Sequence, residues 1–147
     1  MDKQDLSPMT MLEIATQHVR CAEFLLQHNG EVIFEDGQND DALIPVTSLL
    51  HMAFEITLKI FAISNYRSIK QHRNLLELVE LNEELGLSKQ EVELIKKLMR
   101  QQAFRKGSYY DLWENRQHQQ IFCEQILKLY ERIESQLPLE FSKDYQQ

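Results

Sequence analysis

The longest apolar run of the chain, residues 43–64, is the feature that most limits its fold. If these residues form a helix, nearly all of its faces are apolar, which is typical of a helix that other helices surround. It also carries His51, Glu55 and Lys59, whereas a helix that crosses a membrane has few or no charges. We therefore predict a buried central helix in a cytoplasmic protein without membrane contact.

Apolar residues at helical spacing predict further helices on both sides of this run. The first helix begins at Ser7–Pro8, because Ser is a good N-cap and Pro is favoured at the first helical position. It ends near residue 28, before Gly30. A third helix is expected over 72–85, with Gly86 as its left-handed cap. Its leucines, Leu76 among them, are expected to face the core.

Two capping boxes predict the starts of the last two helices. Residues 88–91, Ser-Lys-Gln-Glu, open a fourth helix that ends at Gly107. Residues 111–114, Asp-Leu-Trp-Glu, resemble a second box, and the fifth helix then continues to Leu137 and stops at Pro138.

Few residues in the chain favour tight turns. The 147 residues include only 4 Gly and 3 Pro, too few for a β-sandwich or barrel, and no strand-length alternation of polar and apolar residues is present. We predict a single all-α domain over 1–147: a five-helix antiparallel bundle with a central apolar second helix. Residues 1–7 and 139–147 are expected to be frayed tails.

The chain is acidic, with a formal net charge of −7. This charge argues against nonspecific binding of nucleic acid and permits a basic protein partner. Residues 31–41 form an acidic loop, either solvated or in contact with a partner, that contains Glu35, Asp36, Asp40 and Asp41. The spacing of these carboxylates does not match a calcium-binding loop, so no metal is predicted there.

A polar stripe runs along the apolar helix at spacings of three and four, formed by Ser48, His51, Glu55 and Lys59. Glu55 and Lys59 are spaced for an ion pair within the helix. The stripe is either a seam facing solvent or a polar groove lined by His51 and Glu55. A helical zinc site more typically has two His residues four apart, so neither metal nor cofactor is predicted.

The two cysteines, Cys21 and Cys123, do not belong to a Cys-x-x-Cys pair. Small apolar residues of this kind are usually buried and reduced in intracellular proteins. We predict that both are buried free thiols, with a disulfide or a shared metal as the alternative.

Two segments resemble the HEPN superfamily of helical bundles. Residues 53–59, Ala-Phe-Glu-Ile-Thr-Leu-Lys, resemble that superfamily's Ala-x-Glu-x-x-Leu-Lys helix, and residues 72–78, His-Arg-Asn-Leu-Leu-Glu-Leu, resemble the start of its next helix. Residues 103–113 lie where the family carries an Arg-x4–6-His motif, just before the last long helix. The resemblance implies either a metal-independent ribonuclease, active as a pair of chains, or a non-catalytic protein that binds nucleotides or proteins.

The chain departs from the family motif at its second position. Arg105 is present, but Tyr110 stands where the His is expected, and a phenol is a poor base at neutral pH. A literal Arg-x4-His occurs from Arg67 to His72, but it lies between the second and third helices. If the chain is a ribonuclease, the resemblance assigns phosphate binding to Arg105, assisted by Tyr110, His51 or His72.

Cations and aromatic residues are mixed around this segment, in the set Arg100, Arg105, Lys106, Tyr109, Tyr110 and Trp113. Such a set can bind RNA bases or a nucleotide, form a hot spot for another protein, or pack as a junction between helices with Trp113 in the core.

The small size, the acidity and the missing His together favour a non-catalytic protein-binding module, with a possible homodimer. It would act as an antitoxin or immunity protein against a basic toxin or nuclease. The alternative is an HEPN-type ribonuclease or nucleotide-binding protein.

Overall fold

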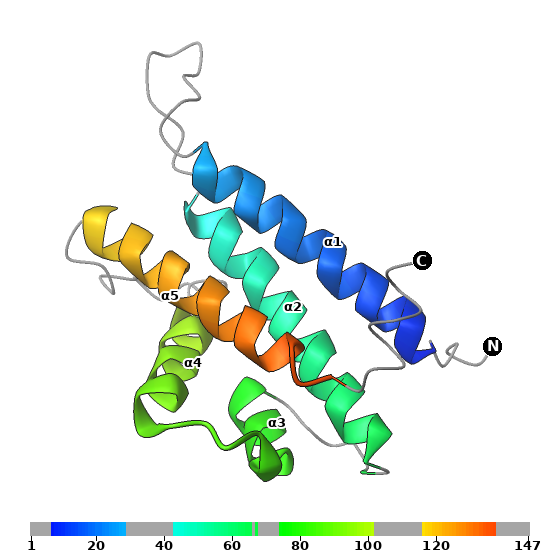
Figure 1. Cartoon of the computed structure of the whole chain (residues 1–147). Coiled ribbons are helices and arrows are strands. Elements are labelled where there is room, and N and C mark those ends of the chain that lie inside the picture. The colour runs from blue at the N-terminus through cyan, green and yellow to red at the C-terminus, as the bar shows by residue number, and fades with distance from the viewer. Residues whose placement is uncertain (1–6, 29–42, 66, 68–73, 102–115, 138–147) are drawn as a thin grey trace.

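The computed structural model of the chain describes residues 7–28, 43–65, 67, 74–101 and 116–137 (Figure 1). Within these ranges the backbone forms five α-helices, one 3-10 helix and no strand. The α-helices are α1 Pro8–Gln27, α2 Leu43–Ser64, α3 Leu75–Leu81, α4 Lys89–Gln101 and α5 Arg116–Glu134, and the 3-10 helix is η1 Glu83–Leu85. The prediction of an all-α bundle is confirmed.

Helix α2 occupies the centre of the bundle. It contacts α1, α3, α4 and α5, and α1 lies along it in the opposite direction (Figure 1). By length and composition α2 is the one helix of the described ranges that is apolar enough to cross a membrane, over Pro45–Ser64. In this structure 56% of that stretch is buried within the protein, as the core of a helical bundle requires.

Two predicted helix starts are confirmed, and Gly86 has the predicted left-handed conformation, although it caps η1. The Ser7 hydroxyl accepts a hydrogen bond from the Thr10 amide at 3.1 Å, which caps α1. Gly86 has φ 63°, in the left-handed region that favours glycine. At the start of α4 the Ser88 and Glu91 side chains each accept a hydrogen bond from the other residue's amide, at 3.1 and 2.9 Å.

The prediction of one continuous third helix is wrong. Helix α3 begins only at Leu75, because Asn74 is extended and its side chain caps the helix. The helix ends at Leu81, Asn82 has a non-helical backbone, and the separate 3-10 turn η1 follows. Residues 72 and 73, the expected first two residues, lie outside the described ranges.

The other predicted ends are tested only in part. The expected end of the fourth helix, at Gly107, and the second capping box, at 111–114, fall outside the described ranges. Helix α5 ends at Glu134, before the predicted Leu137, although Leu137 is still buried in the core.

The two cysteines differ in exposure. Cys123 is buried and Cys21 is exposed, and both are free thiols. The prediction that Cys21 is buried is therefore wrong. Val19 and Ala22 lie on the face of α1 that packs against the core. Position 21 lies on another side of the helix, where its side chain is exposed.

Candidate functional site

The structure describes two of the predicted site residues, Arg100 and His51. The remaining ones lie outside the described ranges: Glu35, Asp36, Asp40, Asp41, His72, Arg105, Lys106, Tyr109, Tyr110 and Trp113. The described part of the chain therefore contains only the start of the predicted cation–aromatic cluster, at the last turn of α4.

The polar stripe of α2 is half-buried along its length. Ser48, His51, Glu55 and Lys59 all have intermediate exposure. The predicted ion pair is present, with Lys59 Nζ 2.9 Å from Glu55 Oε2. Both side chains remain about a third or more exposed, at 31% and 41%, so the pair adds little stability. Met52, 46% exposed, lies on the same side of the helix, and this mixture is typical of a seam at the edge of the core.

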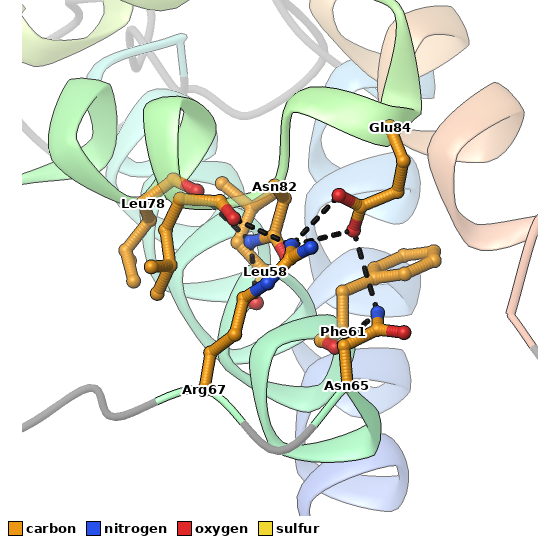
Figure 2. Close-up of polar contacts among 8 residues, drawn as sticks. Leu58, Phe61, Asn65, Arg67, Leu78, Asn82 and Glu84 are labelled. Atoms are coloured by element: carbon orange, nitrogen blue, oxygen red, sulfur yellow. Dashed lines mark hydrogen bonds and ion pairs between the residues drawn. The ribbon is translucent and has the colours of Figure 1, made fainter.

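Arg67 lies just after α2 and ties it to the end of α3 (Figure 2). Its guanidinium donates hydrogen bonds to the Leu81 carbonyl at 2.6 Å and to both Glu84 carboxylate oxygens at 2.7 and 2.9 Å. Asn65 donates a further hydrogen bond to Glu84 at 3.3 Å. A phosphate could reach this guanidinium only in competition with Glu84. The geometry therefore supports a structural role for Arg67, the first residue of the literal Arg-x4-His.

Glu84 is ionised more readily than an ordinary glutamate because of this contact. Burial acts to raise the pKa of Glu84, but the hydrogen bond and positive charge of Arg67 outweigh it, and the pKa lies below its usual value. The pair is 36% and 42% exposed. The main effect of the Arg67–Glu84 pair is to hold the segment after α2 against the end of α3.

Asn82 completes the same junction from inside the protein (Figure 2). Its side chain is 1% exposed, and its Nδ2 donates to the Leu58 carbonyl of α2 at 3.1 Å and to the Leu78 carbonyl of α3 at 2.9 Å. One amide group thus joins two helices. Helix α3 ends at this residue, whose backbone is not helical and whose side chain bonds back to the carbonyl four residues earlier.

A shallow hollow lies between α3 and α4. It has a volume of about 370 Å³ and is lined by Leu76, Lys96, Met99 and Arg100. We call it the α3–α4 groove. Leu76 and Met99 are its apolar lining residues, and Lys96 and Arg100 of α4 are its charged ones. The prediction that Leu76 faces the core is corrected by its half-buried position here.

Contacts on the other side of α4 hold the groove in place. Arg132 of α5 makes two hydrogen bonds to the Glu91 carboxylate, at 2.8 and 2.6 Å. Burial acts to raise the pKa of Glu91, but hydrogen bonds from Ser88 and Arg132 outweigh it and lower the pKa. Lys97 lies over the Phe122 ring at 5.5 Å. These contacts orient α4 so that its opposite flank faces α3.

A buried polar chain links α2 to α5 on another side of the core. Thr57 and Tyr130 hydroxyls lie 2.9 Å apart, and the Tyr130 hydroxyl donates to Glu134 at 3.4 Å. Burial raises the pKa of Glu134, opposed by the Tyr130 hydrogen bond and reinforced by the negative charges of Glu131 and Glu23. The ionised form of Glu134 is therefore disfavoured in the folded protein.

We expect Glu134→Gln to raise the melting temperature at about pH 7.5 and to have little effect at about pH 4. A carboxyl whose pKa is raised by folding destabilises the folded state above that pKa, and this cost disappears as the pH falls through the pKa to the unfolded value. Glutamine removes the charge and keeps an acceptor for Tyr130. Thermal unfolding of both proteins across this pH range measures the difference. A gain independent of pH, or one matched by Glu13→Gln on the exposed face of α1, would contradict it.

Three of these features were not predicted from the sequence: the Asn82 bridge, the Arg67–Glu84 pair and the α3–α4 groove. Asn82 interrupts a run of good helix formers, and this was the one local signal that it has a special role.

Comparison of the chain with family models, curated proteins and solved structures gives no significant match.

Proposed function

We propose that the chain is a non-catalytic helical module that binds another protein, of the antitoxin or immunity type, and that its partner has a basic surface. The observation that carries this proposal is the acidic edge formed by α3 and η1. Four carboxylates lie on this edge, Glu77, Glu80, Glu83 and Glu84, and residues 74–88 contain no Lys or Arg.

Three of the four glutamates of the acidic edge are exposed. Glu80, Glu83 and Glu84 are exposed, and of these only Glu84 is held by a cation of the described residues, Arg67. The Asn82 bridge fixes the backbone beneath them. An edge of one sign raises the rate at which an oppositely charged partner docks and selects its orientation. Together with the net charge of −7, it supports a basic partner.

The alternative function is an HEPN-type ribonuclease, and a single assay compares the two. Purified protein and the variant Arg105→Ala are incubated with total RNA. We expect no cleavage by either protein. Cleavage that is lost in Arg105→Ala would overturn the proposal in favour of the enzyme.

The binding itself is tested by calorimetric titration with a basic protein encoded beside this one. We expect a complex that the double variant Glu80→Lys/Glu83→Lys weakens by about tenfold or more, which is about 1.4 kcal/mol of binding free energy. The variant Glu13→Lys changes the net charge in the same direction on the exposed face of α1, and we expect it to weaken binding less than about twofold. Equal losses in both variants would show that the acidic edge is not the contact surface.

A further inference from the structure

We draw no further inference here: the strongest candidate, the partly exposed apolar face of α2 formed by Leu49, Met52 and Ile56, carries none, because nothing in the part of the chain that the structure describes shows what covers it.

Discussion

Asn82→Asp lowers the free energy of unfolding by about 3–5 kcal/mol at neutral pH, the largest expected effect of a nearly isosteric change in this chain. The substitution replaces the Nδ2 donor by an oxygen. That oxygen then faces the carbonyls of Leu58 and Leu78, which Nδ2 now bridges at 3.1 and 2.9 Å. A carboxylate would be buried at a site where the side chain is 1% exposed, without a donor to stabilise it.

The opposite end of the same helix supplies the matched control. Asn74 caps α3 by accepting a hydrogen bond from the Glu77 amide at 2.9 Å. Aspartate caps a helix as well as asparagine does, so Asn74→Asp is expected to change stability by less than about 0.5 kcal/mol. Urea denaturation followed by circular dichroism measures both variants. Losses of similar size in the two variants would show that the Asn82 bridge contributes little.

The effect of Asn82→Asp also has a predicted pH dependence. Burial raises the pKa of the carboxyl introduced at position 82, so the folded state favours its protonated form. The destabilisation is complete above the raised pKa and shrinks as the pH falls towards the unfolded value. The loss should therefore be smaller at about pH 4 than at about pH 7, once the wild-type protein is measured under the same conditions.

Phe54→Ala is expected to lower the free energy of unfolding by about 3–5 kcal/mol, enough to unfold much of a protein of ordinary stability. Phe54 is fully buried on α2 and meets the Tyr130 ring of α5 edge to face, with ring centroids 5.4 Å apart and an interplanar angle of 85°. The substitution removes the ring contact and leaves a cavity between the two helices.

The control is the same substitution on the surface. Phe24, on α1, is 59% exposed and stacks on His28 with ring centroids 4.2 Å apart. Phe24→Ala is expected to change stability by less than about 0.5 kcal/mol, because most of the ring is already in water. Chemical denaturation compares the two variants. If Phe24→Ala is as costly as Phe54→Ala, the packing around α2 is not what this structure describes.

Features that depend on neighbouring residues were predictable from the sequence. The central position of α2 follows from an apolar pattern on all sides. The caps at Ser7, Gly86 and Ser88–Glu91 follow from residues at most four positions apart, as does the Glu55–Lys59 pair. In each case the interaction depends on residues that are close together in the chain.

Features that join distant segments were not predictable in this way. The Asn82 amide meets Leu58, 24 residues earlier in the chain, and Arg67 meets Glu84 across 17 residues. No periodicity connects such positions. The break in the third helix was missed for the same reason: Asn82 leaves the helix to make a bond that only the folded bundle provides. The α3–α4 groove likewise exists only where Leu76 and α4 are brought together.

The central position of α2 has a consequence for how the protein is made. Its cover comes from α1, earlier in the chain, and from α5, near the other end, as the pairing of Thr57 with Tyr130 shows. During synthesis α2 therefore leaves the ribosome long before α5 is available to pack against it. Until α5 has been made, the nascent chain contains an incompletely covered helix that is, by length and composition, apolar enough to cross a bilayer. The order of the helices therefore leaves α2 without the cover of α5 until most of the chain has been made.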